Sequence, residues 1–507
     1  MRIVAAIGLG LVLLAGAAPA GAASVPGQDL PSAYGRQSAR WGACPPAQKE
    51  LRKAGARCAK IRVPLDYGDP GGPMIEIAIS RVKAKGPRRG ILLANPGGPG
   101  GTGLAYALSL RPALKGVADR YDLIGFDPRF LGDSTPITCA PGGPQRAPGR
   151  SSTARRDFEA SVKSARDLAR RCRENGDNAT LLPHATTRNV ARDMDLIRAA
   201  LGAPKLSYYG VSYGADLGAV YAQLFPRRVD RMVIDSSTDP AATQYELFRR
   251  AGRPLEAGLD EWARWAAGRH EEYRLGRTAA RVRATVENLV DRAERRPIAA
   301  GDTRLGAPVV RLLLRQFVQE QHYDAALAGL VRDLVKAASD NPGKPGPDLS
   351  RMLGLLASRD LAASLTGGAL FMCGDAGWPA GGWPKDPETY WKNVQRSRAA
   401  QPVFGPLVNG MIAPCAFWTR PAGPVTAIGN DVPVLMVQAR RDDNVPYAGA
   451  LALHRRLTGS RLVSADIRAH GVYGRGTAGL PPAACADRAV NAYLAGGPLP
   501  ERDLNCP

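Results

Sequence analysis

The chain has 507 residues, of which 45% are hydrophobic and 22% are charged, and this balance excludes a disordered chain and predicts a large globular core. The net charge of +22 at pH 7 is typical of proteins that bind nucleic acids or anionic surfaces. The positive residues, however, are mostly arginines spread over helices and loops with acids between them, and no basic run contains interspersed aromatics. We therefore expect a solvated surface and no nucleic-acid partner, with loose adhesion to acidic polymers as the alternative.

The beginning of the chain, residues 1–23, has the features of a secretory signal peptide. It contains one basic residue, an apolar run of about a dozen residues and small residues in A-x-A spacing. This run is shorter than the ~20 residues that cross a bilayer, and no later segment reaches that length. We expect cleavage, secretion and no membrane contact; the alternative is an uncleaved N-terminal anchor.

The cysteines indicate an oxidising compartment. The chain has eight, an even number, and none forms a C-x-x-C pair that would favour a metal site. They fall along the chain as four neighbouring pairs, so bridging in sequence order is the simplest pattern: Cys44 with Cys58, Cys139 with Cys172, Cys373 with Cys415, and Cys485 with Cys506. Buried free thiols are the alternative.

From residue 60 the sequence alternates between strand and helix patterns. Short apolar stretches predict strands over 60–67, 74–82, 90–98, 121–129, 205–211 and 231–237. Helices are expected over 186–202, with an apolar stripe from Val190 to Leu201, and over 212–225. This alternation predicts a mostly parallel sheet flanked by helices, whose first part comprises residues 24–235.

Between residues 236 and 430, long helical patterns follow one another with Pro- and Gly-rich loops between them. Such a length exceeds that of ordinary connecting loops, so we expect a large all-helical lid inserted before the last strands. The alternation returns in the final part, residues 431–507, with strands at 432–439 and 460–467 and helices at 446–459 and 483–497. The predicted fold class is α/β, with a sheet interrupted by a helical cap.

Ser212 lies between two glycines in the string GVSYG, where a predicted strand turns into a predicted helix. This is the context of a nucleophile elbow, a strained turn that lifts a serine hydroxyl above the sheet. Gly210 and Gly214 give the clearance that such a turn needs, and Gly218 lets the helix lie close to the strand. We predict that Ser212 is the nucleophile; the alternative is an incidental serine in a Gly-rich turn.

A serine nucleophile needs a base, and the base needs a group that fixes its tautomer, in the chain order serine, acid, histidine. Of the five histidines, His470 follows the last predicted strand in the loop AHGVYG, whereas the others lie too early in the chain or inside a predicted helix. Asp442 and Asp443 directly follow the strand at 432–439, and we choose Asp442, which comes four residues before Pro446. Asp443 is then expected to be a helix cap or a solvated charge.

An oxyanion hole needs backbone N–H donors that point at the developing negative charge. Tyr213 supplies one as the residue after the nucleophile, and the loop NPGGPGG at 95–101 supplies the other. Small residues in this loop let the main chain approach a substrate carbonyl, and Gly98 is the expected donor. A plain turn without this role is the alternative.

These features together resemble one family, the secreted α/β-hydrolases of the prolyl and tripeptidyl aminopeptidase type with a TAP-like C-terminal segment. The resemblance is carried by VPLDY at 63–67, NPGGPGGTG at 95–103, YDLIGFDPR at 121–129, YYGVSYGADLGAVYAQLFP at 208–226, FMCGDAGWP at 371–379, PCAFW at 414–418 and AHGVYG at 469–474. It implies an α/β-hydrolase fold, the catalytic set Ser212, Asp442 and His470, and a lid over the active site. Phe130 stands where the DPRGxGxS motif of the family has a glycine.

The resemblance also implies a serine exopeptidase that removes single residues or short peptides from the free N-terminus of its substrate. Such an enzyme must hold an α-ammonium group, and Asp375, beside Cys373, is the candidate partner; a helix cap or a surface acid is the alternative. No metal or organic cofactor is implied. Two other functions stay open, a secreted esterase or lipase with the same triad and a catalytically silent binding protein on the same fold.

Overall fold

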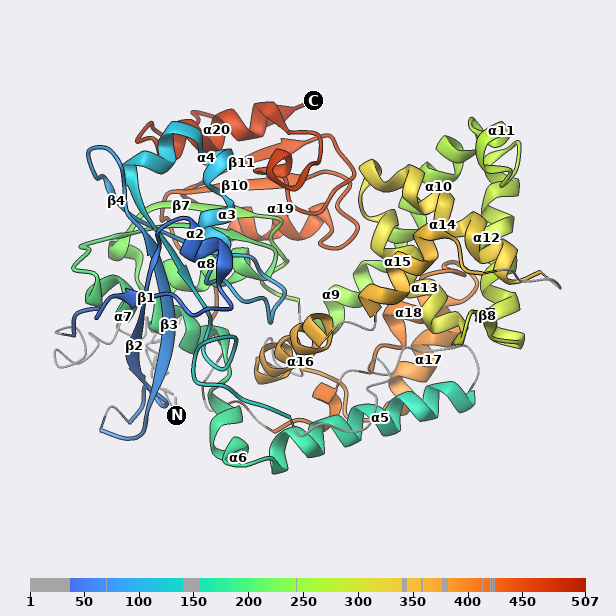
Figure 1. Ribbon diagram of the computed structural model, residues 1–507, viewed down its shortest axis with the longest axis horizontal. Helices are drawn as coiled ribbons and strands as arrows, with labels where there is room; N and C mark the ends of the chain where they lie inside the picture. The colour runs from blue at the N-terminus through green and yellow to red at the C-terminus, as the bar shows by residue number, and fades with distance from the viewer. Residues whose placement is uncertain are drawn as a thin grey trace, which may run out of the picture.

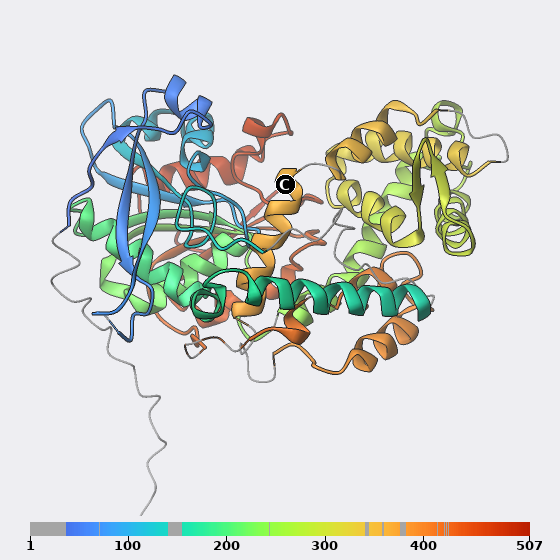
Figure 2. The same ribbon diagram turned by 60° about the horizontal axis from the view of Figure 1, so that its bottom comes forward.

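The computed structural model describes residues 37–69, 71–139, 155–242, 244–339, 344–356, 359–375, 382–412, 414–419, 421, 423 and 425–507. The predicted signal peptide lies outside these residues. Figure 1 shows two parts side by side, a sheet with its helices and a separate cluster of helices. Figure 2 shows the long helix α5 (Arg155–Glu174) running along both parts.

The sheet forms the centre of the first part. Within the described residues it has ten strands, in the order β1 (Gly42–Ala43), β2 (Arg57–Pro64), β3 (Met74–Val82), β5 (Tyr121–Phe126), β4 (Gly90–Asn95), β6 (Leu206–Val211), β7 (Val229–Asp235), β10 (Val434–Ala439), β11 (Ser460–Ala465) and β12 (Leu504–Cys506). The pairs from β1 to β5 are antiparallel, and those from β5 to β12 are parallel. The predicted, mostly parallel sheet is therefore confirmed, and each of its eight longer strands overlaps a predicted one.

Both faces of the parallel strands are buried under helices. Ile91 and Leu93 of β4 belong to one hydrophobic cluster, and Leu92 and Ala94 belong to another on the opposite face. The first cluster includes residues of α7 (Thr187–Ala200), α8 (Tyr213–Leu224) and α19 (Tyr447–Arg456), and the second includes residues of α3 (Tyr106–Ser109), α4 (Arg111–Leu114) and α20 (Ala484–Leu494). Shorter helices are α2 (Lys49–Lys53) and α6 (Asn178–Leu181).

The chain between β7 and β10, which we call the insertion, is mainly helical, as predicted. Its helices are α9 (Gln244–Arg250), α10 (Gly252–Ala267), α11 (His270–Tyr273), α12 (Ala279–Arg295), α13 (Ala307–Val318), α14 (Asp324–Ala337), α15 (Pro347–Leu356), α16 (Arg359–Gly374), α17 (Pro387–Ser397) and α18 (Gly405–Asn409). Helices α10, α12, α13 and α14 share a hydrophobic core of their own, which contains Trp262, Leu289, Leu314 and Leu330. The division of the chain at residues 23, 235 and 430 stays a prediction.

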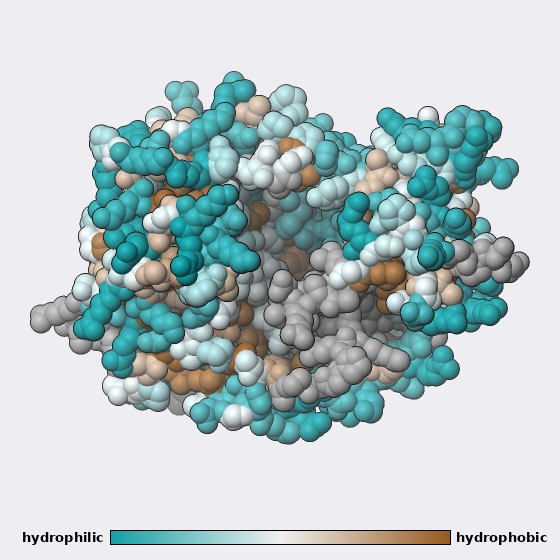
Figure 3. All heavy atoms as spheres, in the orientation of Figure 1, coloured by the Kyte–Doolittle hydropathy of each residue, from teal (hydrophilic) through white to brown (hydrophobic). Residues whose placement is uncertain are grey.

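Two details of the insertion differ from an independent, all-helical domain. A hairpin of β8 (Ile298–Ala300) and β9 (Thr303–Leu305) lies between α12 and α13, and such short strands leave no distinct sequence pattern. The later helices also pack on the sheet part, because Phe371 of α16 and Tyr390 of α17 belong to its first hydrophobic cluster. Figure 3 shows that this side of the molecule is largely hydrophilic and is hollowed between the two parts.

The disulfides join the cysteines in sequence order, as predicted. All eight cysteines lie in the described residues, and the bonds are Cys44–Cys58, Cys139–Cys172, Cys373–Cys415 and Cys485–Cys506. Since no cysteine is free, the alternative of buried thiols is excluded. None of the described helices is long and apolar enough to cross a membrane.

Candidate active site

Ser212 stands at the junction of β6 and α8, in a turn with φ 59° and ψ −125°, a conformation that serine rarely adopts. Neighbouring backbone leaves no room for side chains around it. A Cβ atom on Gly210 would lie 2.2 Å from the Gly214 carbonyl oxygen, and one on Gly214 would lie 2.6 Å from the Asn95 carbonyl oxygen. The turn therefore has the strained backbone and the glycine clearance that the sequence predicts for a nucleophile elbow.

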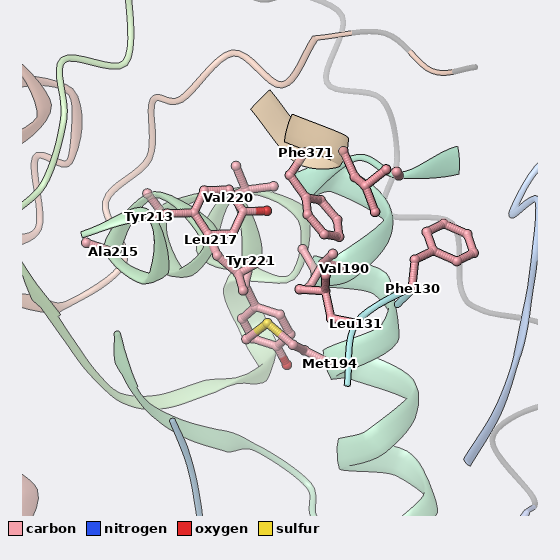
Figure 4. Packing of buried hydrophobic residues seen from close by; sticks show 14 of the residues in the cluster. Phe130, Leu131, Val190, Met194, Tyr213, Ala215, Leu217, Val220, Tyr221 and Phe371 are labelled. Carbon is pink, nitrogen blue, oxygen red and sulfur yellow. The ribbon is translucent and has the colours of Figure 1, made fainter. Parts of the chain in front are cut away.

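Helix α8 holds this turn in place through close packing. A Cβ atom on Gly218 would lie 2.8 Å from Tyr208 Cε1 of β6, so a larger residue would push the helix away from the strand. Figure 4 shows α8 packed beside α7, with Val190 and Met194 of α7 facing Tyr221 of α8. Because α8 is buried on several sides, the backbone at its first turn is rigidly supported.

The loop at 95–101 lies directly against the elbow. A Cβ atom on Gly97 would lie 3.0 Å from Ser212 Cβ and 3.2 Å from the Tyr213 amide nitrogen. The Gly97 N–H donates to Asn95 Oδ1 at 2.9 Å, so its hydrogen-bonding capacity is already used. The next amide along the chain belongs to Gly98, and this is the donor that the sequence predicts beside Tyr213.

His470 and Asp442 contact each other after β11 and β10. His470 Nδ1 lies 2.9 Å from Asp442 Oδ2. The other oxygen of this buried carboxylate accepts the N–H groups of Asn444 at 3.0 Å and Val445 at 2.8 Å, and Gln438 Nε2 donates to Oδ2 at 3.2 Å. These bonds hold the carboxylate in place, and of the two neighbouring aspartates it is Asp442 that contacts the imidazole.

The loop that carries His470 also lies against the elbow. A Cβ atom on Gly471 would lie 3.4 Å from Val211 Cγ2, and Val211 is the residue before Ser212. The Ser212 N–H donates to the Asp235 carbonyl at 2.8 Å, and the Gly471 N–H donates to Ser236 Oγ at 2.9 Å. The ends of β6, β7, β10 and β11 therefore bring the loops of all three sequence-predicted residues to one edge of the sheet.

The environment of His470 acts on its pKa in two opposite ways. Burial disfavours the charged imidazolium and lowers the pKa, whereas the charge of Asp442 and its hydrogen bond raise the pKa. The carboxylate outweighs burial, so the pKa of His470 lies above the ordinary value of histidine. An imidazole with this pKa gains a proton readily, because the carboxylate of Asp442 stabilises the protonated form.

Asp235 is a site residue that the sequence analysis missed. Its carboxylate is buried and accepts the N–H groups of Val472 at 2.9 Å and Tyr473 at 2.8 Å, just after His470. Tyr209 Oη also donates to it at 3.1 Å. The sequence signal for this role is the position of Asp235 at the end of the apolar strand pattern RMVID. A carboxylate buried there needs several hydrogen-bond donors, which neighbouring loops must supply.

The expectation for Asp443 is wrong. Its side chain is neither a cap nor solvated, since the residue is only 2% exposed and both carboxylate oxygens lack a hydrogen-bond partner. Burial, together with the negative charge of the adjacent Asp442, raises the pKa of Asp443 to about 7. No local sequence pattern predicts this burial, because the residues that cover Asp443 come from the insertion, among them Gly258.

The side chain of Asp375, which directly follows α16, contacts the first residue of α7, Thr187. Thr187 in turn contacts Tyr213, the residue after Ser212. The Asp375 carboxylate accepts the Thr187 N–H at 3.1 Å and also the Thr187 hydroxyl, whose oxygen lies 2.8 Å from Tyr213 Oη. Burial raises the pKa of Asp375 to about 6. These bonds correspond to the alternative interpretation, a carboxylate at a helix N-terminus, and a contact with a substrate ammonium stays a prediction.

The described residues contain no group of three or more His, Cys, Asp or Glu side chains arranged to hold a metal ion. The groups that the structure brings to this edge of the sheet are a serine in a strained turn and a histidine–aspartate pair. A mostly parallel sheet with this elbow defines the class of α/β-hydrolases.

Comparison with known proteins identifies the family to which the chain belongs. Residues 90–307 match the family model of the alpha/beta hydrolase fold, and residues 401–506 match the model of TAP-like proteins. Tripeptidyl aminopeptidase from Streptomyces coelicolor is 36% identical over 482 residues, which are 89% of this chain and 83% of that protein. Serine protease Hip1 from Mycobacterium tuberculosis is 30% identical and covers 93% of this chain and 91% of its own. Carboxylesterase B from the same organism is 31% identical, with 89% and 86% covered. The chain belongs to this TAP-like family of α/β-hydrolases.

Proposed function

We propose that this protein is a serine exopeptidase, which hydrolyses peptide bonds near the free N-terminus of its substrates. The observation that carries the proposal is the His470–Asp442 contact of 2.9 Å, in a loop packed beside the strained turn at Ser212. The proposal also draws on the 36% identity with a tripeptidyl aminopeptidase over most of both chains. These facts support a peptidase with a serine nucleophile.

In the proposed mechanism Ser212 Oγ attacks the scissile carbonyl while His470 Nε2 takes its proton. Asp442 orients the imidazole through Nδ1 and stabilises its charge. The amide N–H groups of Tyr213 and Gly98 hold the oxyanion, and the tetrahedral intermediate collapses when His470 returns the proton to the leaving amine. Water then hydrolyses the acyl-enzyme by the reverse of these steps.

The insertion is proposed as the lid of this site, and Asp375 as the group that binds the α-ammonium of the peptide. Its carboxylate is one hydrogen-bonded side chain away from Tyr213, which favours a substrate N-terminus close to the elbow. Secretion after cleavage of the predicted signal peptide completes the proposal. It is supported by the four disulfides, which persist in oxidising compartments.

A secreted esterase is the second candidate. The 31% identity with a carboxylesterase favours it, and an ester carbonyl fits the same set of nucleophile, base and oxyanion donors. Hydrolysis of aminoacyl and tripeptidyl anilides, measured beside p-nitrophenyl esters, separates the two functions. An exopeptidase cleaves the anilides and loses this activity when their N-terminus is acetylated.

The decisive variant for the proposal is Ser212→Ala. We expect it to keep the fold and to lose hydrolysis of every anilide, because no other group can form the acyl-enzyme. Mass spectrometry of the products from a mixed peptide library then gives the length of the released peptide. Anilide turnover by Ser212→Ala at the wild-type rate would refute the proposed nucleophile.

A further inference from the structure

The loop that carries His470 is held from both sides of the interface between sheet and insertion. On the sheet side, Asp235 accepts backbone N–H groups from residues 472 and 473. On the other side, the loop contains two buried arginines, Arg468 and Arg475, which are 1% and 6% exposed. Both arginines pair with carboxylates of the insertion, far away in the chain.

Arg475 forms a two-pronged ion pair with Glu320, which directly follows α13 and its C-cap residue. Its Nη1 lies 2.8 Å from Glu320 Oε2, and its Nη2 lies 2.7 Å from Glu320 Oε1. Arg475 Nη1 also donates to the Gly471 carbonyl at 3.2 Å, so the same guanidinium holds the residue after His470. Paired hydrogen bonds of this kind fix a direction as well as a distance.

Arg468 binds the insertion on the other side of His470. Its Nη2 donates to Asp324 Oδ1 at the beginning of α14, and its Nη1 donates to the Gly258 carbonyl of α10 at 2.8 Å. The backbone takes part as well, because the Gln321 N–H donates to the Arg468 carbonyl at 3.0 Å and the Arg468 N–H donates to Gln321 Oε1 at 3.2 Å. The segment 320–324 thus lies alongside the His470 loop and is hydrogen-bonded to it.

The loop that carries Asp442 has its own contacts with the insertion. Arg315 of α13 donates to Asn444 Oδ1 at 2.5 Å, and Arg441 lies 3.6 Å from Glu261 of α10. Both loops therefore contact α10, while the Asp442 loop also contacts α13 and the His470 loop also contacts Glu320 and the beginning of α14. Buried ion pairs contribute little net stability after desolvation, so their fixed geometry is the property that matters here.

We propose that Glu320 and Asp324 are positioning residues, which hold His470 in its catalytic place against Asp442 through Arg475 and Arg468. We call these two ion pairs the lid clamp. The insertion then completes the active site as well as covering it, because the base stays aligned only while the clamp is formed. This inference rests on the proposed function, in which His470 is the general base.

The test compares Glu320→Gln with a matched variant, Glu294→Gln. Both remove a carboxylate from an ion pair with a buried arginine. The Glu294–Arg311 pair, at 2.8 Å, however joins α12 to α13 inside the insertion and leaves the catalytic loops untouched. The measurements are the rate of labelling by a small fluorophosphonate probe, kcat and KM for the anilides, and hydrogen exchange of residues 466–475.

We expect Glu320→Gln to reduce kcat and the labelling rate by about 10²-fold, because a misplaced base costs that much, while KM changes little. Its acid limb moves to lower pH, since a looser Asp442 contact raises the pKa of His470 less. Exchange in 466–475 accelerates. Glu294→Gln should keep the labelling rate, kcat and pH profile of the wild type, even if its melting temperature falls as much as that of Glu320→Gln.

Equal effects of the two variants, or wild-type labelling by Glu320→Gln, would overturn the clamp. If Glu320→Gln does not fold, the double variant Glu320→Gln, Arg475→Gln removes the unpaired buried charge and is read in the same way. A wild-type chain that neither cleaves substrates nor reacts with the probe would instead overturn the proposed function. A reactive wild type with unaffected clamp variants overturns the present inference alone.

Discussion

At the scale of single residues, the contact between His470 and Asp442 decides the proposed chemistry. Burial lowers the pKa of the imidazole, and the charge and hydrogen bond of Asp442 raise it above the ordinary value of histidine. A general base must be neutral to accept a proton. Activity should therefore fall on the acid side of this raised pKa and reach its plateau above it.

Asp442→Asn tests this contact. An amide cannot stabilise the imidazolium, so we expect kcat to fall by roughly 10⁴-fold. The acid limb of the remaining activity should move to lower pH, because burial then acts on the pKa of His470 without the opposing carboxylate. Asp443→Asn is the neighbouring control and should keep far more activity. A fall in kcat that is no larger for Asp442→Asn than for Asp443→Asn would exclude the assigned acid.

Asp443 makes a separate prediction about stability. Its pKa of about 7 in the folded protein lies above the value of 3.8 in an unfolded chain, so folding favours the protonated form. The wild type should therefore lose stability as the pH rises from 4 to about 7, where the buried carboxyl ionises. Asp443→Asn stays neutral, so its melting temperature should exceed that of the wild type at pH 8 and approach it at pH 5. A higher melting temperature for the wild type than for Asp443→Asn at pH 8 would contradict the claim that the buried Asp443 carboxylate is destabilising when ionised.

Single residues were predictable from the sequence where a local pattern specifies them. Ser212 has its glycines within two positions on either side, and His470 and Asp442 follow recognisable strands. The role of Glu320 and the burial of Asp443 were not predictable, because the residues that pair with the first and cover the second come from distant parts of the chain. The pairing of Glu320 with Arg475, for example, joins the insertion to the last part of the sheet.

At the scale of elements, the unit formed by β6, the elbow and α8 positions Ser212, the proposed nucleophile. The predicted strand and helix match it closely, since β6 ends at Val211 and α8 begins at Tyr213. The predicted strands at 90–98 and 121–129 ran too far, because β4 ends at Asn95 and β5 at Phe126. The extra residues 96–98 belong to the glycine-rich loop beside the elbow. In the other loop, Asp127 accepts the Gly103 N–H and Arg129 pairs with Asp193, so these residues bond to neighbouring segments and do not extend the strand.

Gly214→Ala tests the tight packing of this unit. Its new Cβ would lie 2.6 Å from a backbone oxygen of Asn95, so the elbow and the 95–101 loop must separate. We expect loss of most activity and a lower melting temperature. Gly354→Ala in α15 is the matched control, because nothing lies within 4 Å of its Cβ. It should be stabilising by roughly 0.5–1 kcal/mol, as alanine favours a helix over glycine. Equal changes in stability in the two variants would contradict the tight packing at Gly214, because the elbow would then accommodate a Cβ atom.

At the scale of the whole molecule, the disulfides stabilise parts of very different length. Cys373–Cys415 closes 42 residues of the insertion, whereas Cys44–Cys58 closes only 14 residues near the N-terminus of the described chain. A disulfide that closes a longer loop removes more entropy from the unfolded chain and so stabilises the fold more. Replacing Cys373 and Cys415 by alanine should therefore lower the free energy of unfolding more than replacing Cys44 and Cys58, with each loss about 2–4 kcal/mol. Urea unfolding of both double variants measures the difference. A larger loss for Cys44–Cys58 would contradict this entropic account.

In the proposed account the sheet and the insertion act together, because buried ion pairs join the His470 loop to the insertion. Sequence patterns predicted both parts and the order of their elements, but the contacts between them depend on side chains far apart in the chain. Arg468 and Arg475 read as ordinary basic residues in the sequence, and only the fold shows them buried against Asp324 and Glu320.

The measurement that tests the central claim most directly is the site of covalent labelling by a fluorophosphonate, identified by peptide mapping of the wild-type protein. A serine in a strained elbow with a paired histidine reacts with such a probe, whereas ordinary serines do not. We predict a single adduct, on Ser212, which disappears in Ser212→Ala and slows in Asp442→Asn. An unlabelled protein, or an adduct on any other residue, would contradict the account.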